Sequence, residues 1–285
     1  QTAFAADSLY VREQQIPILI DRIDNVLYEM RIPAQKGDVL NEITIQIGDN
    51  VNLSDIQAIR LFYSGVEAPS RKGEHFSPVT YISSHIPGNT RKALESYSVR
   101  QDEVTAPLSR TVKLTSKQPM LKGINYFWVS IQMKPETSLL AKVATTIPNA
   151  QINNKPIDIT WKGKVDERHV GIGVRQAGDD GSAAFRIPGL VTTNNGTLLG
   201  VYDIRYNSSV DLQEKIDIGV SRSTDKGQTW EPMRVAMTFK QTDGLPHGQN
   251  GVGDPSILVD EKTNTIWVVA AWTHGMGNER AWWNS

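Results

Sequence analysis

Two short stretches decide the fold: residues 223–230, which read STDKGQTW, and residues 185–188, which read FRIP. The first has the spacing S-x-D-x-G-x-T-W, which is typical of a tight turn between antiparallel strands. Within it the carboxylate of Asp225 can accept backbone N–H groups, Gly227 can adopt a positive φ, and Trp230 can pack beneath the hairpin. We therefore assign structural roles to these three residues.

Short strands are predicted on both sides of this turn. Residues 189–191 and 197–202 are apolar runs separated by an Asn-Asn-Gly turn, which is a strong hairpin signal. Residues 216–221 predict a third strand, and a fourth follows the turn. Four consecutive antiparallel strands make one blade of a β-propeller, and residues 256–272 predict the start of a second. So few strands cannot close a propeller, so we expect another segment to complete it.

The first 160 residues have a different pattern. Residues 42–47, EITIQI, alternate between apolar and polar side chains, which predicts a strand with one buried face. Similar short strands are predicted at 26–32, 58–63, 111–114, 126–133 and 157–161. Their spacing, with little helical periodicity, predicts an antiparallel β-sandwich. Residues 135–156 mix Thr, Ala, Asn and Pro and are interpreted as a return segment or linker. The fold class is therefore all-β, with a sandwich over 1–160 and propeller blades over 161–285.

Composition excludes several classes of function. The 285 residues include 30 basic and 31 acidic side chains, which argues against a broad positive surface for nucleic acid. There is no cysteine, so thiolate chemistry and disulfides are excluded. The five histidines show no paired metal-ligand spacing, and we expect no metal and no cofactor. No apolar run approaches the roughly 20 residues of a membrane-spanning helix.

Arg186 is the first candidate for chemistry. It lies between Phe185 and Ile187, where strand alternation turns it away from its apolar neighbours. A buried guanidinium needs an anionic partner, and its planar fork fits a carboxylate bidentately. From the residue alone two partners remain open: a carboxylate ligand, or an aspartate of the same chain.

The FRIP stretch resembles the F/Y-R-I-P motif of the sialidase (neuraminidase) family, and the 223–230 turn resembles that family's Asp box, which also occurs in propellers that are not enzymes. The resemblance continues in order along the chain through YDIR (202–205), SVDL (209–212), GDPS (253–256) and Trp272. It implies that Arg186 binds the sialic acid carboxylate, with Arg205 beside it and Asp254 on the ring substituents. Trp272 matches an aromatic residue of the N-acetyl pocket.

The resemblance further implies that Asp211 is the general acid/base of an exo-sialidase that releases terminal α-linked sialic acids with retention. A loop aspartate without function is the alternative for Asp211. The family's tyrosine nucleophile and a further arginine lie later in a six-bladed propeller, so we expect them beyond residue 285 and expect these 285 residues alone to be inactive. His247 and His274 are weaker candidates for the border of the site.

Three further expectations follow from the resemblance. The N-terminal sandwich is an accessory module, with carbohydrate binding as its expected role. The partners are sialylated glycans, and the location is extracytoplasmic. The start at Gln1, without an initiator methionine, indicates either that a signal peptide was removed or that the chain was trimmed. Two alternatives stay open for the function: a sialic-acid-binding propeller without hydrolysis, and a related transferase or intramolecular lyase.

Overall fold

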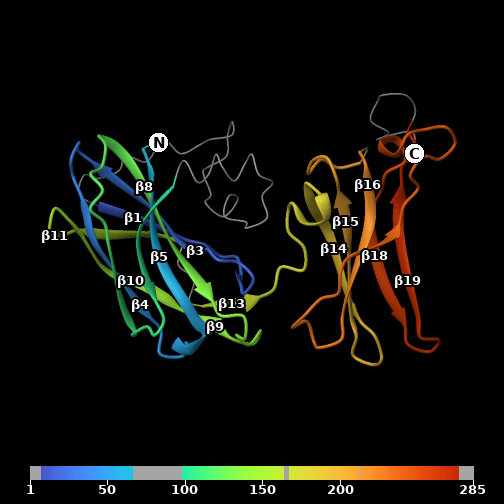
Figure 1. Ribbon diagram of the computed structural model, residues 1–285, viewed down its shortest axis with the longest axis horizontal. Coiled ribbons are helices and arrows are strands. Elements are labelled where there is room, and N and C mark those ends of the chain that lie inside the picture. Colours follow the sequence, from blue (N-terminus) through green and yellow to red (C-terminus); the bar gives the residue numbers. More distant parts are fainter. Residues whose placement is uncertain (1–7, 67–97, 164–166, 213, 276–285) are drawn as a thin grey trace. The chain divides into compact units, whose positions relative to one another are not determined.

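The computed structural model describes residues 8–66, 98–163, 167–212 and 214–275, and within them the chain is all-β, as predicted. The chain divides into two compact units, residues 1–173 and 174–285 (Figure 1). The first unit extends past the predicted boundary near residue 160. The reason is that β12 (Asp158–Lys162) pairs with β1 (Ser8–Glu13), and β13 (Arg168–Gly171) pairs with β2 (Ile18–Leu19).

The remaining elements of the first unit are β3 (Asn25–Ala34), β4 (Leu40–Ile47), η1 (Leu53–Asp55), β5 (Ile56–Gly65), β6 (Val99–Thr105), β7 (Thr111–Thr115), β8 (Gly123–Met133), β9 (Lys142–Val143), β10 (Thr145–Ile152) and β11 (Lys155–Pro156). Those of the second unit are η3 (Asp179–Gly181), β14 (Ala184–Thr192), β15 (Leu198–Arg205), β16 (Ile216–Ser223), β17 (Arg234–Met237), η4 (His247–Gln249), β18 (Val252–Asp260) and β19 (Thr265–Trp272).

Two sheets of the first unit form a sandwich around one core, as the alternation predicts, and β2, β13 and β9 form a small third sheet. The sandwich is not purely antiparallel as expected, since β1 and β12 pair in parallel, as do β2 and β13 of the third sheet. A six-stranded sheet has the order β12-β1-β3-β8-β5-β6, and a four-stranded sheet has the order β11-β10-β4-β7. The alternating residues Ile43, Ile45 and Ile47 of β4 are fully buried in the core, to which both sheets contribute. Each such side chain contributes about 1.5–3 kcal/mol on burial, which fixes the register of the strand.

The interpretation of residues 135–156 as a linker is wrong. This stretch contains β9, β10 and β11, and β10 pairs with β4 in the four-stranded sheet. The pairing is interrupted between Thr146 and Asn149, around Pro148. Proline cannot donate a ladder hydrogen bond and is tolerated in sheets at such bulges, so the residue that argued against a strand marks its irregularity instead.

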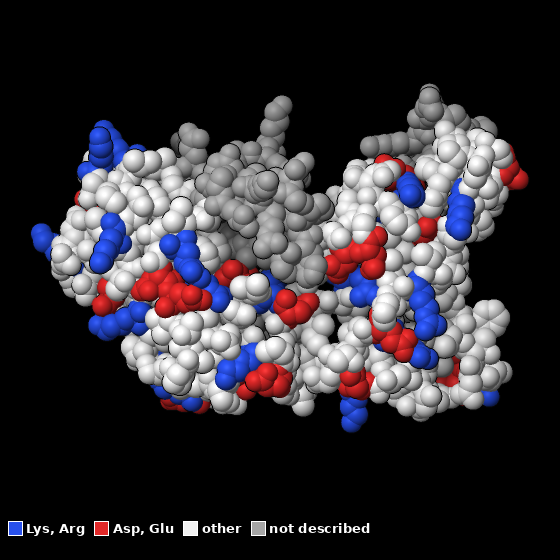
Figure 2. Space-filling view, in the orientation of Figure 1, with Lys and Arg blue, Asp and Glu red and all other residues white. Residues whose placement is uncertain are grey.

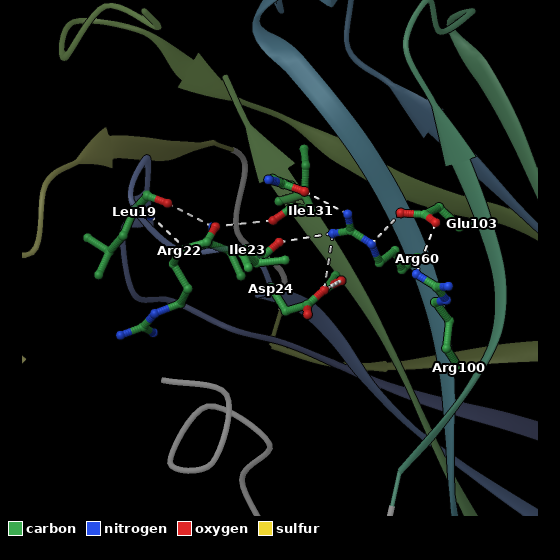
Figure 3. Close-up of polar contacts among 11 residues, drawn as sticks. Leu19, Arg22, Ile23, Asp24, Arg60, Arg100, Glu103 and Ile131 are labelled. Carbon is green, nitrogen blue, oxygen red and sulfur yellow. Dashed lines mark hydrogen bonds and ion pairs between the residues drawn. The ribbon is translucent and has the colours of Figure 1, made fainter. Parts of the chain in front are cut away.

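A buried arginine ties three strands of the larger sheet together. The Arg60 guanidinium donates to Glu103 Oε1 over 2.6 Å, to Gln132 Oε1 over 2.6 Å, and to the Ile23 carbonyl over 3.0 Å (Figure 3). Asp24 lies 3.3 Å from the same guanidinium. The partners come from β6, β8 and the loop before β3, so this one side chain joins segments far apart in the sequence.

The second unit contains the predicted run of consecutive strands. A four-stranded antiparallel sheet has the order β14-β15-β16-β17, and β18 and β19 form a second sheet. The turn between β14 and β15 is closed by Gly196 at φ 83°, as the Asn-Asn-Gly signal predicts. The buried residues Val201, Ile218 and Val252 pack these two sheets together, so β18 lies against the four-stranded sheet of the second unit.

Charges of both signs are interspersed over the face drawn in Figure 2, and neither sign forms a continuous field. Within the described part of the chain, no helix has the length and the apolar character needed to cross a membrane.

Two arginines on the same acceptor provide a test of the buried network. Arg60 and Arg100 both bind Glu103, but their side chains are 10% and 56% exposed. We expect Arg60→Ala to lower the free energy of unfolding of the first unit by about 1–3 kcal/mol, because it leaves partly buried acceptors unpaired. Arg100→Ala should cost less than about 1 kcal/mol. Native-state hydrogen exchange of the β5 and β8 amides measures both, and equal losses would contradict this account.

Candidate functional site

Arg186 lies at a break in strand β14. It pairs with Asp203 of β15, but the register then shifts, and the next pair is Gly189 with Val201. Between them Ile187 has φ 53°, a conformation that is rare for a β-branched residue and further restricted before a proline. The break interrupts the regular alternation of the strand just after Arg186, whose side chain is 43% exposed.

Strand β18 repeats the same break. Gly253 pairs with Ala271, the register shifts, and Asp254 has φ 53° before Pro255. The two breaks lie beside one another, since a Cβ added to Gly189 would be 3.3 Å from Ile257 Cγ2 and 4.0 Å from the Pro255 carbonyl. Non-glycine residues at positive φ are strained and cluster at functional sites, where the surrounding structure holds them. The repeated break thus presents Arg186 and Asp254 on adjacent strands.

Arg205 ends strand β15 and is buried, with its side chain 1% exposed. Its Nε and Nη2 atoms donate to Asp203 Oδ2 over 3.1 and 2.7 Å. Its Nη1 atom donates to Asp211 Oδ1 over 2.7 Å and to the Ser209 carbonyl over 3.0 Å. One edge of the guanidinium is therefore held in the protein interior, and the other faces the loop that carries Asp211.

Asp211 brings the two arginines together. Its Oδ1 atom also accepts a hydrogen bond from Arg186 Nη1 over 2.8 Å, while its side chain is 65% exposed. The hydrogen bond from Arg205 and the charges of both arginines lower the pKa of Asp211. Of the two partners left open for Arg186, the structure shows an aspartate of the same chain. Two guanidinium groups thus converge on one exposed carboxylate of the protein, an arrangement with the charge and the donors to hold an anion.

Asp203 is a site residue that the sequence reasoning missed. It is fully buried, burial raises its pKa, and its second oxygen accepts the Asp254 backbone N–H over 2.9 Å. The available signal was its position two residues before Arg205, because residues i and i+2 of a strand share a face.

Trp272 lies at the end of β19, opposite Val252. Its ring stacks on Phe239 with centroids 4.4 Å apart and lies 5.2 Å from His274. Within the described residues these are its ring contacts, and the three charged side chains Arg186, Arg205 and Asp211 are not among them. The structure thus brings the side chains of Arg186, Arg205 and Asp211 into one cluster, and Asp254 is linked to this cluster through its backbone. Trp272 lies on the hairpin that carries Asp254.

Comparison with known proteins decides the family. Residues 6–156 match the family model described as the N-terminal domain of BNR-repeat neuraminidase. The chain belongs to the BNR-repeat neuraminidase, or sialidase, family. It is 58% identical over 284 residues to a sialidase of Bacteroides fragilis, covering 99% of this chain and 52% of the relative. It is 38% identical over 88 residues to a sialidase of Paraclostridium sordellii, covering 31% of this chain and 20% of that relative.

A solved structure agrees. The chain matches the Hadza microbial sialidase Hz136 with a TM-score of 0.83 and 59% sequence identity, covering 97% of this chain and 53% of that one. The chain thus spans about half the length of these two sialidases. The activity of the whole protein is therefore a matter for proposal.

The two candidate histidines of this sialidase-family chain support the loop that leads to Asp254. His247 Nε2 lies 2.7 Å from Asp217 Oδ1, and the Tyr206 hydroxyl donates to the other oxygen of Asp217 over 3.0 Å. His274 Nδ1 lies 2.9 Å from Asn250 Oδ1. Among the described residues no group of three or more His, Asp or Glu side chains could hold a metal ion.

The 223–230 turn lies at the opposite end of the sheet from the arginines, since Ser223 pairs with Leu198 whereas Ile216 pairs with Arg205. Asp225 accepts from Ser223 Oγ, from the Thr229 backbone N–H over 2.9 Å and from Thr229 Oγ1 over 2.6 Å.

Two further residues of the turn have the predicted structural features. Gly227 has φ 87°. Trp230 Nε1 donates to the Gly227 carbonyl, and a Cβ added to Gly200 would be 3.6 Å from the Trp230 ring. These contacts are the turn-stabilising kind that the sequence predicts for Asp225, Gly227 and Trp230.

The turn makes a pH-dependent contribution to stability. Hydrogen bonds from Thr229 and Ser223 lower the pKa of Asp225 to about 2. A carboxyl group with a lowered pKa in the folded state stabilises that state above its unfolded pKa, and the contribution is lost as the pH falls through the folded value. We expect the Asp225 carboxyl carbon to titrate near pH 2 by NMR, and Thr229→Val to move the midpoint upward. A midpoint near the ordinary aspartate value in the parent would contradict these contacts.

Proposed function

We propose that the protein is an exo-sialidase, which hydrolyses terminal α-linked sialic acids from glycoconjugates with retention of configuration. The observation that carries the proposal is that Arg186 and Arg205 meet at one carboxylate oxygen of Asp211. Sialic acids carry a carboxylate, and two guanidinium groups turned to one anionic oxygen have the charge and the donors to bind it. The sialidase names of the relatives support the same reaction.

The substrate carboxylate takes the place that Asp211 occupies between the two guanidinium groups. Arg186 binds it, Arg205 lies beside it, Asp254 contacts the ring substituents, and Trp272 lines the pocket of the N-acetyl group. Asp211 is well suited to this exchange because its side chain is exposed and is held only by hydrogen bonds that another carboxylate can replace.

The exchange also prepares Asp211 for catalysis. A general acid near neutral pH needs a raised pKa, whereas the pKa of Asp211 is lowered while the arginines hold it. Release from both guanidinium groups and a new negative charge nearby each raise that pKa. Asp211 then protonates the glycosidic oxygen as the bond to the sugar breaks, and later takes a proton from the attacking water.

Retention requires a nucleophile, and we propose a tyrosine from the part of the protein that follows these residues. A neutral phenol avoids the repulsion that a carboxylate nucleophile would meet from the substrate carboxylate. In the same proposal the second unit is the first part of a six-bladed propeller with an Asp box at 223–230. The N-terminal sandwich is an accessory, carbohydrate-binding module of an extracytoplasmic enzyme that acts on sialylated glycans.

A sialic-acid-binding protein without hydrolysis is the second candidate. The lowered pKa of Asp211 favours it, because a carboxylate that stays ionised cannot act as an acid. Incubation of the full-length protein with a fluorogenic sialoside separates the two. Free sialic acid among the products supports the hydrolase, a transferred or anhydro sugar supports a transferase or lyase, and binding without turnover supports the second candidate.

The role of Arg186 in binding the substrate carboxylate is tested with a matched control variant. In the full-length protein we expect Arg186→Ala to lower kcat/KM for a sialoside by about 100-fold, the loss of a charge-assisted hydrogen-bonding pair of about 3 kcal/mol. The control is Arg222→Ala, since Arg222 is half exposed in the same unit and binds Glu231 through two donors. It should leave kcat/KM within about threefold. Equal losses in both variants would remove the support for a carboxylate site at Arg186.

Proton uptake tests the exchange at Asp211. Because the pKa of Asp211 is lowered before binding and rises when the ligand displaces it, binding of sialic acid at a pH between the two values must take up protons. We expect calorimetric titrations at a series of pH values, each in two buffers of different ionisation enthalpy, to show this uptake. Asp211→Asn should abolish it and retain binding. Uptake that persists in the variant would assign the proton to another group.

A further inference from the structure

A single buried carboxylate contacts two separate parts of the site. Asp203 lies on β15 opposite Arg186, and its side chain is fully buried. Burial of a charge is costly unless hydrogen bonds and an opposite charge compensate it. Asp203 has both, and among the described residues its hydrogen-bond partners, Arg205 and the backbone N–H of Asp254, belong to the candidate site.

The first oxygen orients Arg205. Oδ2 accepts from both Nε and Nη2, which fixes the guanidinium in its plane and leaves the Nη1 edge turned toward Asp211 and the Ser209 carbonyl. A guanidinium held along one edge loses little further rotational freedom when its other edge binds an anion. Asp203 therefore sets the direction in which Arg205 can bind.

The second oxygen holds the break in β18. Oδ1 accepts the backbone N–H of Asp254, the residue at φ 53°. The approach is close, since a Cβ added to Gly253 would lie 3.4 Å from both Asp203 oxygens and 3.3 Å from Leu212 Cδ1. The carboxylate thus stabilises a strained backbone conformation on a neighbouring sheet, and that conformation presents the Asp254 side chain to solvent.

We propose that Asp203 is a positioning residue of the sialidase site, which holds Arg205 and Asp254 in register with each other across two sheets. The inference rests on the proposed function for its catalytic consequence, but its geometric content does not. A buried ion pair that only stabilised the fold would have no reason to bind, with its other oxygen, the backbone of a second substrate-contacting residue.

The test uses Asp203→Asn in the full-length protein. The amide keeps the size of the side chain and an oxygen for the Asp254 N–H, but it places an NH₂ group against the two Arg205 donors. We expect the crystal structure to show the guanidinium displaced, and kcat/KM for a sialoside to fall about 100-fold, as an ångström-scale misplacement can cause. KM should rise and kcat fall, because both binding and the placement of Asp211 depend on Arg205.

The matched control is Asp225→Asn. Asp225 stabilises the 223–230 turn at the opposite end of the same sheet, where it accepts hydrogen bonds from Ser223 and Thr229. It should lower the melting temperature, as Asp203→Asn does, and leave kcat/KM of the folded protein within about threefold. Loss of activity in both variants in proportion to the loss of stability would overturn the positioning role.

Gly253→Ala is the second variant, and it decides the outcome if Asp203→Asn does not fold. Gly253 lies outside the left-handed region of φ, so alanine is permitted there. Its methyl group would lie in contact with both Asp203 oxygens at 3.4 Å and more tightly against Leu212 Cδ1 at 3.3 Å, without removing a charge. We expect about a tenfold loss of kcat/KM. A folded Asp203→Asn or Gly253→Ala variant with parental kinetics and unmoved Arg205 would overturn the proposal. A parent without sialidase activity would overturn the proposed function instead, while the crystal structures would still test the geometry.

Discussion

The second unit depends on one buried ion pair at the end of β15. Arg205 and Asp203 lie two residues apart on the same strand, and both side chains are almost completely removed from solvent. Such a pair does little for stability by itself, since the cost of desolvating both charges offsets most of their attraction. Its consequence is directional: one edge of the guanidinium is fixed inside, so the remaining donor can meet an anion only from the side of the 206–212 loop.

A break in the strand provides the other half of the site. At Ile187 and at Asp254 the backbone has the same positive φ, and a proline follows each residue. In a regular strand, successive side chains would keep pointing to alternate faces of the sheet past Ile187 and Asp254. The break interrupts this alternation and so changes the direction of the neighbouring side chains. Because the two breaks lie on neighbouring strands, a local irregularity that is costly in each strand alone yields one shared surface.

Much of this could be predicted from the sequence. The EITIQI alternation gave a buried strand, the Asn-Asn-Gly turn gave a hairpin, and the order of short motifs indicated Arg186, Arg205, Asp211 and Asp254. Strand β10 could not be predicted, because Pro148 and its polar neighbours contradict strand propensity and only pairing with β4 overrides it. Asp203 could not be assigned a role, since its importance lies in a contact 51 residues further along the chain.

Two buried arginines in this chain show why residue type alone does not identify a binding site. Arg60 has its guanidinium surrounded by Glu103, Gln132 and a backbone carbonyl, all fixed by the sandwich, and it stabilises the fold. Arg205 has equally good hydrogen bonds, but its outer partner is the exposed carboxylate of Asp211 on a loop. In the proposed function a ligand carboxylate replaces that partner at little cost, because Asp211 regains its hydration when it leaves. What distinguishes a ligand-binding arginine from a structural one is whether one of its acceptors can be exchanged with solvent or substrate.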